Sequence, residues 1–340
     1  MAAPGTMTAH SGSLVLGDRR VVLGTCLGRG TLATVYRATL ESQLGVRRLV
    51  ACKVFGALSS DDYDVVVERL GDIVRSTACI RHPNVAEVLE LSAGTKLRQP
   101  FVLTELVEGA SLRRVLDTLA TRGRRVPLDL ALFIGCEIAE GLNGARVAKD
   151  PEGRPLGIAH LDLSAREVLL SWQGGVKLTD FRMSSAKPAG SAVRSLSGVA
   201  RRADTMAPEV ARGAGGDARS DVFSLGVLLH ELLIGPRFAK GITEAEALRH
   251  ARDGFMPPLT FEPHLPADVK KIVDRALEPS PDRRYAHTGA LAYELRRVAF
   301  QLGVGDSRFF LRSLLETELA DERSDATVPS VHKRKRITRR

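Results

Sequence analysis

Residues 160–170 read HLDLSAREVLL, and residues 176–182 follow as VKLTDFR. Each segment places one aspartate, Asp162 or Asp180, next to a short apolar run that is typical of a strand. Two carboxylates on neighbouring loops of this kind would converge on one site. Asp162 would then lie near an attacking hydroxyl group, and Asp180 would lie on a metal ion.

A glycine-rich turn precedes these motifs, at residues 27–35 (LGRGTLATV) between two candidate strands. Gly28 and Gly30 alone are a weak signal, because many tight turns use two glycines. The signal becomes stronger with residues 50–53 (VACK), where a strand carries Lys53 among apolar neighbours. A lysine with a buried stem beside a phosphate-covering loop is one way in which proteins hold triphosphate oxygens.

The periodicity of apolar residues divides the chain into a β-rich first part and a helical second part. We therefore expect an α+β protein with two lobes and a cleft between them. The expected strands are 21–27, 33–40, 49–55, 85–91 and 101–106, with a helix at 61–80, and the expected later helices are 112–120, 128–147, 221–234, 267–277 and 289–301.

Composition describes an ordinary folded chain of 340 residues, 44% of them hydrophobic and 26% charged. No apolar run approaches the roughly 18 residues of a membrane helix, and the N-terminus lacks the pattern of an export signal. We expect a cytoplasmic protein without a transmembrane segment. The cysteines stand apart among apolar neighbours, which favours core thiols over zinc ligands or disulfides at Cys26, Cys52, Cys79 and Cys136.

The net charge of +9 is concentrated at the C-terminus, where the last eight residues hold six basic side chains and no acid. The rest of the chain carries only +3, so it is nearly balanced. We interpret this basic segment as a solvated tail, with contact to nucleic acid, acidic protein or anionic lipid as the alternative. Residues 307–322 have an apolar face, which favours packing on the second lobe over partner docking. The residues on roughly this one helical face are Phe309, Phe310, Leu311, Leu314, Leu315 and Leu319.

Three more motifs follow in order, MAPE at 206–209, SDVFSLG at 220–226 and PDRRY at 281–285. With these motifs the sequence resembles the protein kinase family over about residues 20–302. Residues 80–85 (IRHPNV) and 101–109 (FVLTELVEG) look most like bacterial Hanks-type serine/threonine kinases. The resemblance implies the bilobal kinase fold, with a flexible leader (1–18), an N-lobe (19–106), a C-lobe (107–302), an amphipathic helical extension (303–323) and a basic disordered tail (324–340).

The resemblance also implies ATP as the ligand and gives site residues their roles. Asp162 would be the catalytic base, Lys53 would contact the α- and β-phosphates, and Asp180 would bind the metal. Gly28 and Gly30 would cover the phosphates. Thr104 would be the gatekeeper, the main chain of Glu105 and Val107 would meet the adenine, and Val35, Ala51 and Leu169 would enclose its ring.

Two departures from the family pattern affect the metal site. Glu167 stands where the family has an asparagine that binds the second metal ion. A carboxylate there can bind magnesium, but it adds charge beside Asp180 and the phosphates. Arg182 stands where the family has the glycine of its Asp-Phe-Gly motif, here residues 180–182, and it could neutralise Glu167. Both changes predict weakened magnesium binding.

A third departure lies in helix 61–80, which should supply a glutamate to Lys53. Counting back from His82 places Ile73 in that position, with Asp72 one residue earlier and Glu68 a turn before. Asp72 could substitute if the helix shifted by one residue. The next inward position is Thr77, where the family prefers an apolar residue. We therefore expect that helix 61–80 does not adopt the position that it has in an active kinase, where it pairs with the lysine.

Residues that act on the activation segment and on the catalytic aspartate depart from the family pattern as well. Leu161 replaces the arginine that binds a phosphorylated segment, and Arg202 takes the place of the threonine that orients the catalytic aspartate. Ser164 replaces a lysine, for which Arg166 could serve as it does in tyrosine kinases. By contrast Glu209 and Arg284 retain the residue types of a structural ion pair.

These observations predict a kinase-like protein that binds ATP, with weak or absent phosphotransfer, and that presents a surface to a protein partner. The first alternative is a competent serine/threonine kinase that uses Glu167 as a metal ligand and acts on protein substrates. The second is an adaptor that binds nucleic acid or anionic surfaces through the basic tail. Nucleic acid is the least favoured partner, because the tail is short and has no interleaved aromatic residues.

Overall fold

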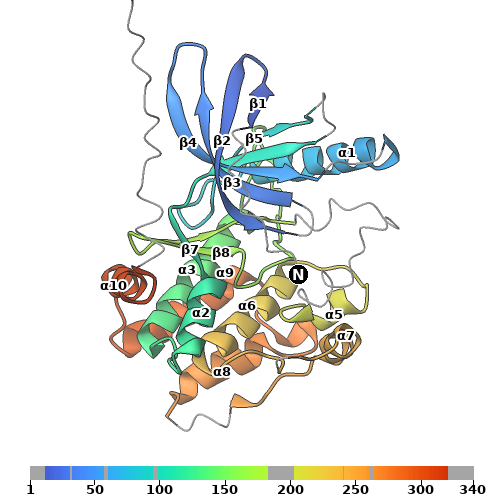
Figure 1. Cartoon of the computed structure of the whole chain (residues 1–340). Coiled ribbons are helices and arrows are strands. Elements are labelled where there is room, and N and C mark those ends of the chain that lie inside the picture. Colours follow the sequence, from blue (N-terminus) through green and yellow to red (C-terminus); the bar gives the residue numbers. More distant parts are fainter. Residues whose placement is uncertain are drawn as a thin grey trace, which may run out of the picture.

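An antiparallel sheet with the strand order β1-β2-β3-β4-β6-β5 forms the first lobe. The computed structural model describes residues 12–30, 33–56, 60–94, 99–182, 203–239, 241–259 and 264–320. Helix α1 (Ser60–Thr77) packs beside β5 (Figure 1). The strands are β1 (Ser13–Leu16), β2 (Arg19–Arg29), β3 (Ala33–Glu41), β4 (Arg47–Phe55), β5 (Val88–Ser92) and β6 (Phe101–Glu105).

Helices form the second lobe, and a small antiparallel sheet of β7 (Gly109–Ser111), β8 (Val168–Ser171) and β9 (Val176–Leu178) lies where the two lobes meet (Figure 1). The predicted bilobal α+β architecture is confirmed. The helices are α2 (Leu112–Thr121), α3 (Leu128–Arg146), α5 (Pro208–Ala211), α6 (Ala218–Leu233), α7 (Glu244–Asp253), α8 (Ala267–Ala276), α9 (Thr288–Gln301) and α10 (Arg308–Glu318), with a 3-10 turn, η3 (Pro281–Arg283).

Local sequence signals account for several of these element ends. Asp217 and Ser220 form a capping box at the start of α6, and Thr243 and Glu246 form another at the start of α7. Gly254 ends α7 in the left-handed region with φ 70°. Helices α3 and α6 are buried on almost every side and carry the core of the lobe. The predicted helix ends agree with α2, α3, α6, α8 and α9 to within three residues.

Two expectations from the sequence are corrected. The leader was expected to reach residue 18, but residues 13–16 form β1, which pairs with β2 so that Ser13 faces Val22. Leu16 is buried against Val21, and this apolar contact draws the segment into the sheet. The polar helix α7 was not expected, because its sequence EAEALRHARD has few apolar positions. Residues 324–340 lie outside the described residues.

The cysteines follow the core-thiol interpretation only in part. Cys52 and Cys136 are buried, and burial raises the pKa of each thiol to about 12. Cys79 is half-buried, and Cys26 is exposed. Cys26 departs from the expectation because the pairing of β2 with β3 is irregular on both sides of it, and such bulges redirect side chains.

No helix in the described parts of the chain is long and apolar enough to span a bilayer.

Candidate active site

The loop that carries Asp162 is held in place by Asp221 of α6. The carboxylate of Asp221 accepts hydrogen bonds from the main-chain N–H groups of His160 at 2.7 Å and Leu161 at 2.8 Å. Asp221 is buried, and its burial raises the pKa of the carboxyl group to about 7. Leu161 adopts a left-handed backbone conformation with φ 62°. The buried carboxylate thus fixes an otherwise unfavourable turn just before Asp162.

The ring of His160 joins this loop to the one that carries Asp180. Its Nε2 lies 3.0 Å from the carbonyl oxygen of Thr179, and its ring centroid is 4.3 Å from that of Phe181. The main-chain N–H of Asp162 donates to Nδ1 at 3.3 Å. Burial lowers the pKa of His160, so the neutral ring donates through Nε2 and accepts through Nδ1. The two motifs predicted to converge therefore do so.

Lys53 of β4 forms an ion pair with Asp180. The Nζ atom of Lys53 lies 2.8 Å from Oδ2 of Asp180, and both side chains are mostly buried, with exposed fractions of 17% and 28%. Asp180 has a left-handed backbone conformation with φ 64°. The residue expected on the nucleotide phosphates and the residue expected on the metal thus bind each other.

Helix α1 supplies no carboxylate to this lysine at the predicted position. Ile73 faces inward and is buried in an apolar cluster with Leu70 and Phe55. The expectation that Asp72 could substitute is wrong, because its side chain is 69% exposed and pairs with Arg75 on the same helix. The rotation of α1 that buries Ile73 turns the preceding residue to solvent. Glu68 is also exposed.

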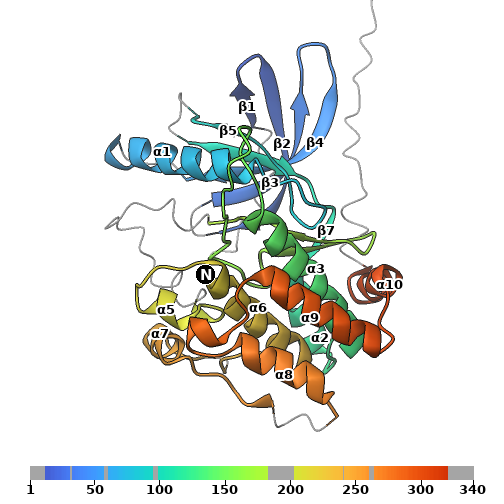
Figure 2. The same ribbon diagram turned by 180° about the vertical axis from the view of Figure 1, so that it is seen from behind.

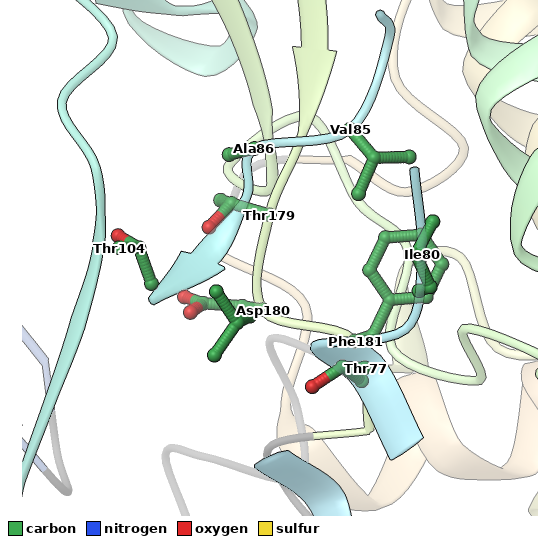
Figure 3. Close-up of a pocket in the computed structure, with 9 residues that line it drawn as sticks. Thr77, Ile80, Val85, Ala86, Thr104, Thr179, Asp180 and Phe181 are labelled. Carbon is green, nitrogen blue, oxygen red and sulfur yellow. The ribbon is translucent and has the colours of Figure 1, made fainter. Parts of the chain in front are cut away.

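Thr77 lies inward, as expected, and its hydroxyl donates to the carbonyl oxygen of Ile73 at 2.7 Å. With Thr104 and Phe181 it lines a pocket of about 10 Å³ (Figure 3). Figure 3 shows that Asp180 and Phe181 point in opposite directions from one turn, Asp180 toward Thr104 and Phe181 toward Ile80. The space behind the gatekeeper is therefore nearly closed, with room for little more than one water molecule.

Glu167 is half-buried beside the two aspartates. It accepts a hydrogen bond of 2.5 Å from Oγ of Ser164. Burial raises the pKa of its carboxyl group to about 7, and the neighbouring charges of Asp180 and Asp162 act in the same direction. Ser164 is therefore a partner of Glu167 that we did not expect. The main-chain N–H of Arg182 donates to the carbonyl oxygen of His160 at 3.0 Å, with φ 53° for this residue.

The residues expected at the metal do not fit a magnesium ion in this arrangement. Among the described residues, no three His, Cys, Asp or Glu side chains are grouped so that they could hold a metal ion. Asp180 is engaged by Lys53, and burial raises the pKa of Glu167 to about 7. Magnesium requires ionised oxygen ligands in near-octahedral geometry. Both carboxylates would have to change partner or protonation state before they could bind it.

The adenine side of the cleft does fit the predicted ligand. Val35 lies opposite Lys53 across β3 and β4, and Ala51 lies opposite Thr104 across β4 and β6. Within the described part of the chain, the main-chain N–H of Val107 has no hydrogen-bond acceptor. Glu105 is held by Lys177 at 2.9 Å. Leu169 lies on β8, and Gly28 and Gly30 lie at the exposed end of β2.

The predicted pair of Glu209 and Arg284 is confirmed. Arg284 donates through both Nη atoms to the two carboxylate oxygens of Glu209, each at 2.8 Å. The Arg284 side chain is fully buried, and Ser220 donates to Glu209 at 2.7 Å. Burial alone would raise the pKa of Glu209, but the hydrogen bonds from Arg284 and Ser220 outweigh it and lower that pKa.

Two residues that sequence reasoning missed hold the end of the activation segment. The hydroxyl of Thr205 donates to the carbonyl oxygen of Leu163, next to Asp162, at 2.6 Å. The buried guanidinium of Arg237 donates to the carbonyl oxygens of Ala203 at 3.3 Å and Met206 at 3.2 Å. No pattern in the sequence marks an arginine after a proline as a buried anchor. Arg202, which we had placed at this position, lies outside the described residues, and Arg166 is exposed.

Comparison with known proteins agrees with this geometry. A family model described as protein tyrosine and serine/threonine kinase matches residues 21–291. The chain is 31% identical over 286 residues to the serine/threonine-protein kinase PknB of Mycobacterium tuberculosis. The matched region covers 82% of this chain and 43% of that protein.

Two further relatives carry different kinase names. A probable serine/threonine-protein kinase of Clostridium perfringens is 27% identical over 84% of this chain and 39% of its own length. The tyrosine-protein kinase MasK of Myxococcus xanthus is 29% identical over 89% of this chain and 46% of its own. The chain thus spans less than half the length of these relatives.

Proposed function

Because this chain belongs to the protein tyrosine and serine/threonine kinase family, we propose that it binds ATP in the cleft between its lobes and transfers phosphate weakly or not at all. Its main role would then be to present a nucleotide-dependent surface to a protein partner in signalling. The ion pair between Lys53 and Asp180 carries this proposal.

The ion pair joins Lys53 and Asp180, two charged groups that have separate partners during phosphoryl transfer. In this family the lysine contacts the α- and β-phosphates and is held by a glutamate of the helix, while the aspartate holds magnesium. Here Ile73 occupies the glutamate position, so Asp180 becomes the partner of Lys53. ATP can still contact the lysine from the open side of the cleft, but Asp180 then faces the phosphates without a bound cation.

The half-buried carboxyl group of Glu167 supports the same proposal. Burial raises its pKa to about 7, and a carboxyl group that holds its proton more tightly would be a weaker ligand for a metal ion. Losing the second metal position and the helix glutamate together removes several groups that stabilise transition-state charge, and each such group typically contributes about 2 to 4 kcal/mol. Nucleotide binding depends less on these groups, because the adenine contacts come from apolar side chains and the main chain of residues 105–107.

Two measurements on the full chain test the proposal. Thermal stability with ATP, with and without magnesium, should show a stabilising shift that changes little with the metal, since a ligand bound only to the folded state stabilises it by mass action. Labelled ATP with magnesium or manganese should give little phosphate transfer to the chain or to a generic protein substrate. An absence of any shift at millimolar ATP would contradict nucleotide binding.

A competent kinase is the second candidate, and one observation favours it. Asp162, Lys53 and Asp180 are all present, and Thr205 holds the residue that follows Asp162. In that case magnesium binding would displace Lys53 from Asp180, and Glu167 would ionise as a ligand. Turnover that requires magnesium and is abolished by Asp162→Asn would establish this function and overturn the first.

A further inference from the structure

A second pocket, here called the α6 pocket, lies in the second lobe between α2, α6 and two loops. Its volume is about 220 Å³, whereas one water molecule needs about 10 to 15 Å³. The charged residues that line it are Arg113 of α2, Glu231 of α6, Asp204 and Arg237. The loops that carry Asp204 and Arg237 lead into α5 and α7, which lie side by side (Figure 2). None of its described lining residues also lines the pocket behind Thr104.

One side of the α6 pocket is formed by an ion pair. Arg113 donates through Nη2 to both carboxylate oxygens of Glu231, at 2.7 and 2.8 Å. The two side chains are 24% and 9% exposed. Nη1 of Arg113 also lies 3.5 Å from Oδ1 of Asp117. The charge of Arg113 is therefore compensated, but its Nε atom is buried and has no hydrogen-bond partner among the described residues.

Arg237 forms another side of the pocket, and this residue is only 3% exposed. Its Nε donates to the carbonyl oxygen of Phe255 at 2.8 Å, and its Nη1 donates to carbonyl oxygens of residues 203–206 at 3.2 to 3.4 Å. The guanidinium group also lies over the rings of Phe223 and Phe238. These contacts hold the group in place, but its Nη2 atom is buried without a partner in the described part of the chain.

The positive charge of Arg237 has no matching carboxylate. Among the residues that the structure describes, none forms an ion pair with it. Burial lowers the pKa of Arg237 to about 10, although Asp204 attracts its charge from a distance. Asp204 is itself half-buried, and burial raises the pKa of its carboxyl group. Buried charges in proteins are normally paired, because an unpaired charge is costly to remove from water. The pocket therefore lacks a counter-charge for Arg237.

The two free nitrogen atoms decide which kind of ligand fits. Nε of Arg113 and Nη2 of Arg237 are both hydrogen-bond donors, so the ligand must supply acceptor atoms. A basic side chain has no acceptor and would bring further donors next to Arg237. A phosphate group carries a charge of about −1.5 to −2 and would be repelled by Glu231 and Asp204. A carboxylate carries a single charge and has two acceptor oxygens that bind guanidinium groups well.

We propose that the α6 pocket binds a carboxylate group, with Arg237 as its counter-charge and Arg113 as a second donor. This group belongs to an acidic side chain of a protein partner or to a small free carboxylic acid, and both sources present the same chemistry. The bound carboxylate connects α2 and α6 to residues 203–206, which lead into α5. The proposal does not depend on nucleotide binding, because the pocket is separate from the residues that hold the nucleotide.

Thermal unfolding of the full chain with propionate tests this proposal, with the ionic strength matched by sodium chloride. Propionate has the size of a glutamate side chain. It should raise the melting temperature by about 1 to 3 °C, because a ligand that binds only the folded state stabilises it. The capped peptide Ac-Ala-Glu-Ala-NH2 distinguishes the two sources. It should act at lower concentration than propionate if the ligand is a polypeptide, and at higher concentration if the ligand is a free acid. The same peptide with glutamine should have no effect.

Two variants remove the free donors. Arg237→Lys keeps the charge but loses Nη2, and the double variant Arg113→Gln, Glu231→Gln replaces the ion pair by two amides and loses Nε. Each should weaken carboxylate binding by about tenfold or more, as expected for the loss of a hydrogen bond to a charged group. The matched control is Arg275→Lys, which changes an exposed arginine over the ring of Tyr285 outside the pocket and should respond as the wild type does.

Three results would overturn the proposal. One is a wild type whose melting temperature responds to neither probe. Another is an equal response in the wild type and the variants, which would mean that carboxylates act on the protein surface in general. The third is a response that disappears with saturating ATP, which would place the carboxylate at Lys53 in the nucleotide cleft. Because Arg237 also anchors residues 203–206, the double variant decides the question if Arg237→Lys does not fold.

Discussion

Lys53 and Asp180 bind each other across the cleft, with Nζ of the lysine 2.8 Å from Oδ2 of the aspartate. This contact follows from helix α1, where the inward position belongs to Ile73 and the neighbouring Asp72 faces solvent. An apolar side chain at that position leaves the lysine to the nearest remaining carboxylate. The partner of Lys53 thus depends on which residue occupies the inward position of α1.

Removing the carboxylate of Asp180 should strengthen ATP binding in the absence of magnesium. The Asp180→Asn variant frees Lys53 for the phosphates and removes a repelling charge, which is worth on the order of 1 kcal/mol in a partly solvated cleft. Calorimetric titration without metal should therefore show an affinity several-fold higher than that of the wild type. Asp72→Asn, which removes an exposed carboxylate of the same length, is the control and should leave the affinity unchanged. Equal affinities for Asp180→Asn and the wild type would mean that the ion pair does not restrain binding.

Folding stability should depend on pH through Glu167. Burial raises the pKa of this carboxyl group from its ordinary 4.5 to about 7, so the folded protein keeps a proton that the unfolded chain releases. The favourable contribution is complete below about pH 4.5 and is lost as the pH rises through about 7. Glu167→Gln keeps a neutral side chain at every pH, so its stability relative to the wild type should rise by about 2 to 3 kcal/mol between pH 5 and pH 8.

Urea unfolding of both proteins at the two pH values measures this difference. Asp221 also has a raised pKa, but it is present in both proteins and cancels in the comparison. Glu68→Gln, which changes an exposed carboxylate, should give a difference that does not vary with pH. A constant difference for Glu167→Gln as well would show that this carboxyl group titrates normally.

Ser164 and Glu167 should be energetically coupled, because they share a hydrogen bond. In a double-mutant cycle with Ser164→Ala and Glu167→Gln, the coupling free energy of unfolding should be about 0.5 to 3 kcal/mol, which is the range for residues in direct contact. The cycle of Arg182→Gly with Glu167→Gln should be additive within about 0.5 kcal/mol. Strong coupling in the arginine cycle and none in the serine cycle would restore our initial hypothesis of a pair between Glu167 and Arg182.

The ion pair of Glu209 and Arg284 should be a large contributor to stability whatever the activity. Arg284→Ala or Glu209→Ala leaves a buried partner without its counter-charge, which typically costs about 3 to 5 kcal/mol. Asp282→Ala is the control, because its side chain is 85% exposed in its pair with Arg219 and surface pairs contribute about 0 to 1 kcal/mol. Melting temperatures of the three variants provide the measurement. Similar melting temperatures for all three variants would show that burial does not increase the contribution of the Glu209–Arg284 pair to stability.

The sequence by itself determined the two lobes, the order of the elements and the residues that meet in the cleft. Apolar periodicity is a local property, and it located α3, α6 and α9 closely because their faces must be buried somewhere. The order of the motifs and the residue types in them identified Lys53, Asp162 and Asp180. They also identified the pair of Glu209 and Arg284.

Only the tertiary structure decided which partner each charged group takes. The sequence left Asp72 and Ile73 as alternatives, since a rotation of the helix by one residue exchanges them, and the apolar cluster around Leu70 settled that rotation. It also gave no sign that Ser164 would donate a hydrogen bond to Glu167, which the fold brings about. Such choices depend on packing between segments far apart in the chain and on backbone angles such as the positive φ of Asp180. These are properties of the assembled fold, because no short stretch of sequence encodes the distance between two side chains on different elements.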